Sequence, residues 1–307
     1  MKKYLLYLLL FSSFNLSAQI DSLDWNLYPY DTIVNPYPWP SFSPNTNTNR
    51  NVLLEVYTGH TSVNCPAGLA IAHQLKDSFP DRVFVANIHA SPSGAFQAPQ
   101  TPEFTMDFTT TAGDTYVNDM PGFIGNPLGT INRKETGFGN TVWFFSTDWA
   151  TAVNNELASS PLLVNVQVEY NYYVQTNGLF IHTESEFKDN LTGDYNLIVY
   201  LVRDTVIAPQ KLNNGTTETN YHHQSVLTHN INSTWGSQIT TGSVTNGDIF
   251  YNDYSYQLTD PLIDSTYEID NLSLITYLCD RNSFEVLQVI KTNLNGTAVT
   301  SVNKLNN

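Results

Sequence analysis

Between residues 51 and 89 the chain switches from a strand pattern to a helix pattern and back, which limits the fold more than any other feature. Residues 51–57 (Asn-Val-Leu-Leu-Glu-Val-Tyr) and residues 82–89 (Arg-Val-Phe-Val-Ala-Asn-Ile-His) are short apolar runs typical of buried strands. Residues 66–79 place their apolar side chains within one broad face, as an amphipathic helix does. The sequence therefore predicts a strand–helix–strand unit with two parallel strands.

The turn before this helix carries half of a redox motif. Ser62-Val-Asn-Cys65 lies where a thiol–disulfide enzyme has Cys-x-x-Cys, so the unit is predicted to be thioredoxin-like, with serine in place of the attacking cysteine. A serine hydroxyl has no disulfide chemistry, and dithiol turnover at this motif is therefore excluded. Ser62 is instead predicted to cap the helix, because its oxygen can accept a hydrogen bond from the free N–H groups there.

Cys65 leaves two interpretations open. A packed thiol at the resolving position is inert, whereas an exposed thiol with a depressed pKa can form a mixed disulfide by itself. A buried Cys65 favours a binding protein, and an exposed one favours a monothiol enzyme. The second cysteine, Cys279, falls in a different predicted domain, so we expect two unpaired thiols.

The first 50 residues contain two segments outside the predicted core. Residues 1–19 have the layout of a secretory signal, with Lys2 and Lys3, an apolar run, and cleavage predicted after Ala18. The apolar run is shorter than the roughly 20 residues that cross a bilayer, and no lipid anchor is expected because no cysteine lies nearby. Residues 20–50 are rich in Pro, Asn and aromatic residues and are predicted to form an extended leader on the surface.

The remainder divides into two predicted domains and a tail. Residues 51–160 contain the thioredoxin-like unit, a long Gly/Pro/Thr-rich excursion over residues 91–125, and a helix around residues 148–158. Residues 161–295 contain strands separated by polar turns. Residues 296–307 form a tail. The predicted class is α+β, with a thioredoxin-like α/β domain followed by an all-β, sandwich-like domain.

Composition and motifs narrow the function. The balance of 13 Lys and Arg against 28 Asp and Glu gives a net charge of −15, which argues against nucleic acid. No segment after the signal is apolar enough to cross a membrane. The sequence has no nucleophile elbow, zinc helix, phosphate loop or dinucleotide fingerprint, so we predict no cofactor.

The histidines suggest a metal site only at first sight. His222, His223 and His229 fit no familiar zinc spacing, and adjacent histidines on a strand point to opposite faces, so we predict packing roles and no metal. His60 and His89 lie near the carboxyl ends of the two predicted parallel strands and are expected to flank the Cys65 turn. There they would either tune the thiol or bond to loop carbonyls.

Residues 58–68 (Thr-Gly-His-Thr-Ser-Val-Asn-Cys-Pro-Ala-Gly), residues 221–227 (Tyr-His-His-Gln-Ser-Val-Leu) and the following Trp235-Gly236 carry a family resemblance. With them the chain resembles the twenty-eight-kilodalton outer membrane protein family of Bacteroidetes. The resemblance implies a thioredoxin-like domain before a β-rich domain, and an envelope location. Many members have both motif cysteines, which this chain does not.

The thioredoxin-like fold also implies a place for Pro127, beside the motif, where such proteins have a cis-proline. A proline there can dock a peptide backbone, although a simple turn proline is the other interpretation. The sequence thus predicts an exported protein, periplasmic or associated with the outer membrane, that binds a protein or peptide partner or has a structural role. The alternative is a monothiol disulfide-exchange enzyme using Cys65. The excursion at residues 91–125 and the cleft between Cys65 and Pro127 are the predicted contact surfaces.

Overall fold

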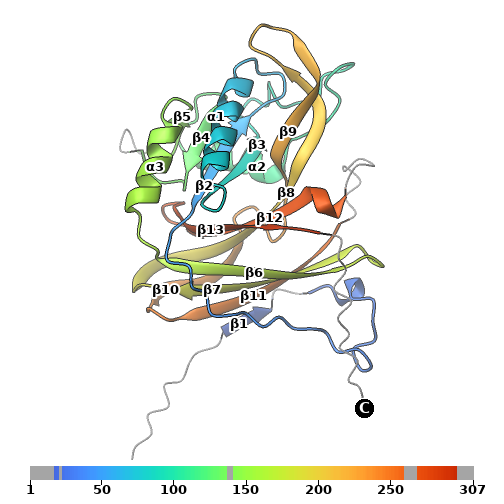
Figure 1. The fold of residues 1–307 in the computed structure, drawn as a ribbon, viewed down its shortest axis with the longest axis vertical. Helices are drawn as coiled ribbons and strands as arrows, with labels where there is room; N and C mark the ends of the chain where they lie inside the picture. The colour runs from blue at the N-terminus through green and yellow to red at the C-terminus, as the bar shows by residue number, and fades with distance from the viewer. Residues whose placement is uncertain (1–16, 21–22, 137–140, 259–267, 296–307) are drawn as a thin grey trace, which may run out of the picture.

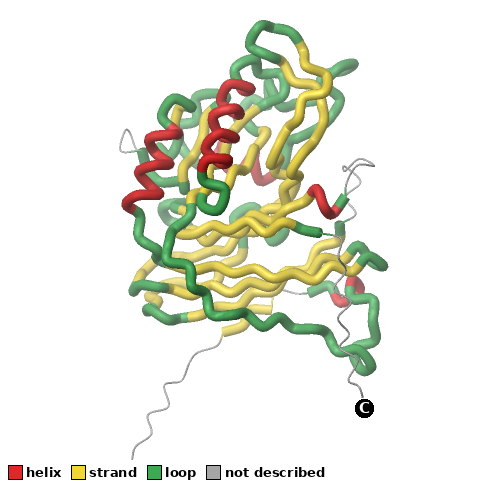
Figure 2. The backbone as a smooth tube through the Cα atoms, in the orientation of Figure 1, coloured by secondary structure: helices red, strands yellow, loops and turns green. Residues whose placement is uncertain are grey.

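The computed structural model describes residues 17–20, 23–136, 141–258 and 268–295 of the 307-residue chain. Most of the predicted signal (residues 1–19) and all of the predicted tail (residues 296–307) lie outside the described residues. The described helices are α1 (Cys65–Ser78), α2 (Thr111–Asp119) and α3 (Trp149–Ser159), with the short 3-10 turns η1 (Trp25–Leu27) and η2 (Ile269–Asn271). The described strands are β1 (Ser17–Ile20), β2 (Val52–Thr58), β3 (Val83–His89), β4 (Leu128–Ile131), β5 (Phe144–Phe145), β6 (Val164–Tyr173), β7 (Gly178–Phe187), β8 (Leu191–Lys211), β9 (Thr217–Asn230), β10 (Ser237–Val244), β11 (Ile249–Gln257), β12 (Leu272–Asp280) and β13 (Val286–Asn293). The protein is thus a mixed α and β structure in which strands predominate, as Figure 2 shows.

The described strands form two sheets. The smaller has the order β1-β11-β7-β6, and the larger has the order β13-β12-β8-β9-β3-β2-β4-β5, with β10 also paired to β8. The larger sheet therefore joins strands from both halves of the sequence. In Figure 1 the helices lie at one end of the molecule, β12 and β13 lie in the middle, and β6, β7 and β11 lie below them.

The strand–helix–strand unit predicted from residues 51–89 is present. β2 and β3 pair in parallel from Val52 opposite Val83 to Thr58 opposite His89. All of β2 is buried because both of its faces are covered. One face packs against α1 and α3, and the other packs against α2 and β8. The continuous apolar run in the sequence is the signature of this two-sided burial.

The strand β8 connects the two halves of the molecule. Residues 191–203 of β8 pair with β10 and β12, and residues 200–211 pair with β9. A strand of 21 residues spans roughly 70 Å, so its far end extends beyond β12. There β9 pairs with β3 through Asn87 and Val226, which brings the outer part of the β8–β9 hairpin beside α1 and β3 (Figure 1).

A second core fills the space between the two sheets. Apolar side chains of β6, β7 and β11 pack there against the inner face of β8, β10, β12 and β13, with Leu179, Leu201 and Leu274 among the fully buried residues. The opposite face of β8 and β12, with Tyr200 and Tyr277, packs against the strand–helix–strand unit. β8 and β12 are therefore buried on both faces, which makes them rigid supports for the neighbouring loops.

The segment from residue 23 to residue 50 lies along the smaller sheet. Its Leu27 and Tyr28 pack on Tyr173 and Phe180 of β6 and β7. Tyr37 Oη lies 2.8 Å from His182 Nε2, and His182 Nδ1 lies 2.5 Å from a carboxylate oxygen of Asp253. These contacts attach the proline-rich segment, which forms no backbone pairing with a described strand, to the smaller sheet.

A buried ion pair within the first half of the chain is tied to the second half through Tyr200. The guanidinium of Arg133 donates to both carboxylate oxygens of Glu55, at 2.7 and 2.6 Å, and to Tyr200 Oη at 2.8 Å. Both charged side chains are fully buried. Arg133 has a φ of 48°, a left-handed conformation that a non-glycine residue keeps only where its surroundings hold it. The ion pair and the fold around it therefore depend on each other.

Candidate functional site

Cys65 is the first residue of α1 and is completely buried. Burial raises the pKa of its thiol, because a thiolate loses solvation in the interior. The neighbouring side chains of Ser62 and Thr58 and the backbone of Gly59 lower the pKa of the thiol without overcoming burial. At neutral pH this sulfur is a thiol, which is the poor nucleophile of the two forms.

The predicted capping role of Ser62 is wrong. The residue before α1 is Asn64, whose side chain makes no capping hydrogen bond, and the helix begins one residue earlier than predicted. The buried Ser62 instead directs its hydroxyl to the Cys65 thiol. Pro66 in the first turn needs no hydrogen-bond acceptor, so the helix starts without a serine cap.

The end of β8 lies over the loop of residues 59–64 between β2 and α1, which we call the motif loop. Gln210 Nε2 donates to the Ser62 carbonyl at 3.1 Å and to the Gly59 carbonyl at 3.4 Å. The Lys211 N–H donates to the His60 carbonyl at 2.8 Å. A strand from the second half of the chain thus closes the motif loop and keeps the thiol from solvent.

Pro127 ends the loop between α2 and β4, which is a second loop of the site. The bond between Asn126 and Pro127 is cis, and the proline ring packs so closely on α1 that a Cβ at Gly68 would lie 2.9 Å from its Cγ. Gln97, which is fully buried, donates to the carbonyl of Thr58 at 2.7 Å and to the side-chain oxygen of Asn126 at 3.1 Å. Three segments distant in the sequence therefore meet beside Cys65.

The residues that join these segments could not be predicted from the sequence. Gln97 lies in the excursion and Gln210 lies in a strand, and neither belongs to a motif with a recognisable spacing. Their importance arises from contacts between residues far apart in the chain, which no local pattern records.

Apolar side chains surround the closed loop. Val63 is 39% exposed, Phe96 is 42% exposed and Ile124 is 73% exposed. They belong to the three connected segments, because the Thr61 N–H donates to the Phe96 carbonyl at 3.2 Å and Ile124 lies two residues before Asn126. We call Val63, Phe96 and Ile124 the loop rim. The site therefore presents an apolar surface around an inaccessible sulfur.

Three imidazoles are buried next to the loop. The ring centroids of His60 and His89 are 6.4 Å apart, and those of His89 and His223 are 5.7 Å apart. Phe108 of the excursion stacks on His89 at 4.5 Å. Burial lowers the pKa of His60, lowers that of His89 well below its usual range, and lowers that of His223 to about 4.

The histidines are thus neutral at pH 7, and the groups that lower the pKa of the Cys65 thiol are Ser62, Thr58 and Gly59 rather than a histidine. His222 is exposed, on the opposite face of β9 from its buried neighbour His223, as the alternation of a strand requires. His229 is exposed further along β9, beyond a register shift in its pairing with β8. Among the residues that the structure describes, no group of three or more His, Cys, Asp or Glu side chains could hold a metal ion.

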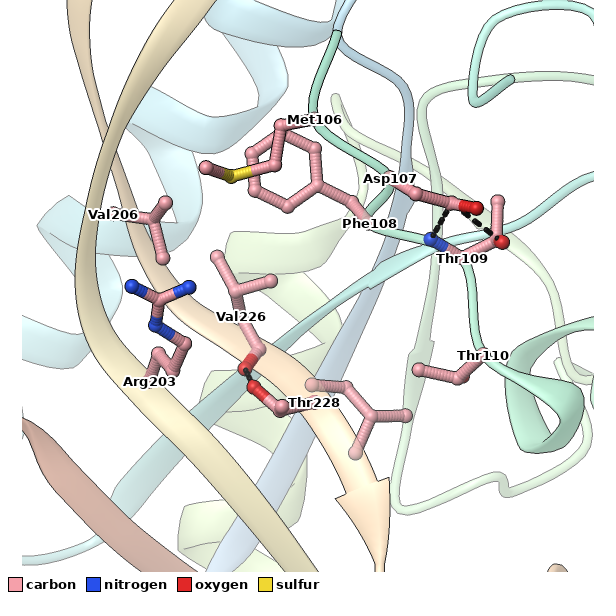
Figure 3. Close-up of a pocket in the computed structure, with 10 residues that line it drawn as sticks. Met106, Asp107, Phe108, Thr109, Thr110, Arg203, Val206, Val226 and Thr228 are labelled. Carbon is pink, nitrogen blue, oxygen red and sulfur yellow. Dashed lines mark hydrogen bonds between the residues drawn. The ribbon is translucent and has the colours of Figure 1, made fainter. Parts of the chain in front are cut away.

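A small cavity lies beside Phe108 (Figure 3). It measures about 50 Å³ and is lined by Met106, Asp107, Phe108, Thr109, Thr110, Arg203, Val206, Val226, Leu227 and Thr228. The Asp107 carboxylate accepts hydrogen bonds from the N–H and the hydroxyl of Thr109, at 2.8 and 2.7 Å, and points away from Arg203 in Figure 3. The cavity has room for a few water molecules rather than for an organic ligand.

The fold and the site together define a β-rich α+β protein. Its loop with the Ser-x-x-Cys motif is closed by β8, a strand from the second half of the chain. The model of the outer membrane protein Omp28 family matches residues 115–298, which is more than half of the chain. The protein belongs to this family, which confirms the resemblance seen in the sequence. Family membership places it in the cell envelope, associated with the outer membrane.

Two solved structures share the fold. HBP35 of Porphyromonas gingivalis matches with a TM-score of 0.61 and 14% identity, over 86% of this chain and 81% of its own. Protein AGR_C_4864 from Agrobacterium tumefaciens matches with a TM-score of 0.50 and 8% identity, over 82% of this chain and 98% of its own. At these identities the likeness concerns the fold alone.

A domain of the outer membrane lipoprotein Omp28 from Porphyromonas gingivalis matches with a TM-score of 0.31 and 20% identity, over 45% of this chain and 93% of its own. No curated protein matches the sequence. Within the described residues, no helix is both long enough and apolar enough to cross a membrane.

Proposed function

We propose that this protein is an envelope binding protein whose thioredoxin-like unit, residues 51–160, uses the loop rim to dock an extended apolar peptide. The observation that carries the proposal is the contrast within one loop, where Cys65 is fully buried while Val63 beside it is exposed. A loop arranged this way offers contact area but no reactive group. The β-rich part, residues 161–295, acts as a sandwich-like support that holds the loop through β8.

The surface chemistry supports a peptide rather than a small molecule. None of the three rim residues lines the small cavity beside Phe108 or the larger one, of about 370 Å³, beside Lys76 and Pro80. The segment ending at Pro127 leads into β4, which is four residues long, and β4 pairs with the two-residue strand β5. β5 is the last of the described strands at this side of the larger sheet, and a sheet edge next to exposed apolar side chains can pair with an extended chain.

The alternative, a monothiol enzyme using Cys65, lacks support from the geometry. Its first requirement is an accessible thiolate, and both the burial of Cys65 and its raised pKa oppose one. Insulin disulfide reduction tests this alternative directly. Activity of the wild type that is lost in Cys65→Ala would replace the binding proposal with the enzyme.

The binding proposal is tested with a permanently unfolded model protein, reduced and carboxymethylated α-lactalbumin, by fluorescence anisotropy. We expect Ile124→Asp to weaken binding at least about tenfold, because it places a charge where an apolar contact is needed. Val34→Asp is the matched control, since Val34 is equally exposed, at 73%, and lies in the segment on the smaller sheet. Equal affinities of wild type and Ile124→Asp, or no binding by the wild type, would overturn the proposal.

A further inference from the structure

The segment on the smaller sheet exposes large apolar side chains that its own packing does not require. Trp25 is 45% exposed, Ile33 92%, Val34 73% and Trp39 52%, and Val174 in the β6–β7 turn is 57% exposed. We call these five residues the leader face. Exposed apolar residues that occur singly need no explanation, but a concentration of them at one end of a molecule marks an interaction surface.

Contacts between rings and turns show that the leader face is continuous. The ring centroids of Trp25 and Trp39 are 6.1 Å apart. Hydrogen bonds from the N–H groups of Val34 and Asn35 to the Asp31 carbonyl, at 3.2 and 2.7 Å, close the turn that carries the two aliphatic residues. In Figure 1 this segment, in blue, forms the lower right corner of the molecule, at the opposite end from α1 and α3.

The β6–β7 turn is tied to the same corner. Gln175 Nε2 donates to Tyr30 Oη at 3.3 Å, and the rings of Tyr30 and Tyr173 are 6.0 Å apart. Val174 lies between these two contacts in the sequence. The strand turn and the segment on the sheet therefore present one surface.

The leader face is built on a fixed base. The buried Tyr37 packs edge-on against Trp25 at 5.2 Å and against Trp39 at 4.9 Å. The hydroxyl of Tyr28 donates to the Asn35 carbonyl at 2.8 Å. Rigid aromatic side chains lose little conformational freedom on binding, and tryptophan is the residue that favours the boundary between a bilayer and water.

The charges around the leader face indicate which kind of lipid surface it can bind. Residues 23–49 contain no Lys or Arg, whereas Asp24 and Asp31 are exposed beside the tryptophan and the aliphatic turn. An anionic surface would repel these carboxylates, and a zwitterionic headgroup with an exposed ammonium complements them. The family to which the chain belongs is associated with the outer membrane, where a lipid surface is at hand.

We propose that the leader face binds the surface of a zwitterionic, phosphatidylethanolamine-type bilayer, with Ile33 and Val34 entering the boundary between headgroups and acyl chains and with the two tryptophans lying at its level. Attachment then comes from apolar contact and not from attraction to anionic lipids. Attachment at this corner leaves α1 and the loop rim at the far end of the protein, away from the bilayer.

The test is flotation of the exported, purified protein with vesicles of phosphatidylethanolamine and phosphatidylcholine. We expect wild type to float with the vesicles, and the double variant Ile33→Ser/Val34→Ser to bind about a hundredfold more weakly, since each of the two aliphatic side chains contributes about a factor of ten. Because these two side chains are largely exposed, their replacement leaves the fold intact. Ile124→Ser, with the same exposure as Val34 but in the loop rim, is the matched control and should float like wild type.

Two further measurements, with added salt and with phosphatidylglycerol in the vesicles, distinguish binding to a zwitterionic surface from binding to an anionic one. Binding that is unchanged by added salt and not increased by phosphatidylglycerol supports the proposal, whereas salt-sensitive binding that requires the anionic lipid overturns it. No binding of the wild type, equal binding of the double variant, or binding only when the vesicles contain lipopolysaccharide also overturns it. The peptide-binding proposal is tested by different variants, so that one of the two can fail while the other stands.

Discussion

Replacing Gln210 with alanine should expose Cys65 without unfolding the protein. Gln210 is fully buried at the end of β8, and its side-chain amide holds the motif loop together with the Lys211 N–H, which donates to the His60 carbonyl. Alanine keeps the strand but removes the amide, and the loop carbonyls lose their donor. The loop can then open locally, since the helix behind it is supported by other contacts.

The size of the effect follows from the hydrogen bonds that are lost. The two bonds to the loop are those that Gln210 Nε2 donates to the Ser62 carbonyl at 3.1 Å and, more weakly, to the Gly59 carbonyl at 3.4 Å. Its contact with the Lys211 carbonyl at 3.0 Å lies within β8 and does not hold the loop. A hydrogen bond of this kind contributes about 0.5–1.5 kcal/mol net, so the free energy of opening the loop should fall by about 1–3 kcal/mol. This corresponds to an increase of about fivefold to about 150-fold in the population of the open loop.

Alkylation by iodoacetamide, read by mass spectrometry at each cysteine, measures this population. Cys65 should be labelled faster in Gln210→Ala than in wild type by that factor, while the equally buried Cys279 serves as an internal standard for global unfolding. Gln288→Ala is the matched control. Gln288 is also a fully buried glutamine, but its amide oxygen accepts from the Asn51 N–H at 2.8 Å, before the start of β2.

The reasoning is refuted if Gln210→Ala labels Cys65 within about twofold of the wild-type rate. It is also refuted if Gln288→Ala accelerates the labelling of Cys65 as strongly, because the loop would then open by unfolding of the whole protein and not by release of β8.

Two further predictions concern buried charge. Glu55→Gln should lower the free energy of unfolding by about 3–5 kcal/mol, because it leaves the Arg133 charge buried without its partner; a loss below about 1 kcal/mol in urea unfolding would contradict this. Since the pKa values of His60, His89 and His223 are lower in the folded protein than the unfolded value of about 6.5, stability should be complete above that pH and fall as the pH decreases toward 4. His223, with its pKa near 4, accounts for about 3 kcal/mol of this fall, so His223→Phe should flatten the pH profile measured by urea unfolding. An unchanged slope would refute this assignment.

The strand–helix–strand unit could be predicted because its signals are local. Apolar residues at strand and helix spacing over residues 51–89 correspond to β2, α1 and β3 within one or two residues. The helix expected around residues 148–158 is α3, at Trp149–Ser159, for the same reason. The capping of α1 was less predictable, because Ser62 and Asn64 both satisfy the preference for a cap and only the path of the loop distinguishes them.

The chemistry of Cys65 was beyond the reach of local patterns. The sequence left both an inert and a reactive thiol open, because a cysteine after a strand and before a helix fits either one. The outcome depends on Gln210, which lies 145 residues further along the chain and reaches the loop only because β8 continues past β12. The hydrophobic periodicity of a single segment predicts neither the length of β8 nor the place of the β8–β9 pair beside β3.

The sequence alone determined that this chain has a parallel strand–helix–strand unit, that its motif cannot perform dithiol chemistry, and that it resembles an outer membrane protein family. These conclusions follow from spacing and from residue type, which are properties of neighbours in the chain. The tertiary structure decided that the remaining thiol is sealed, that three histidines are held neutral together, and that Trp25 and Trp39 share one exposed face. Burial and contact between distant residues arise only when the sheets pack, because solvent exclusion and the pKa shifts it causes are properties of the folded interior.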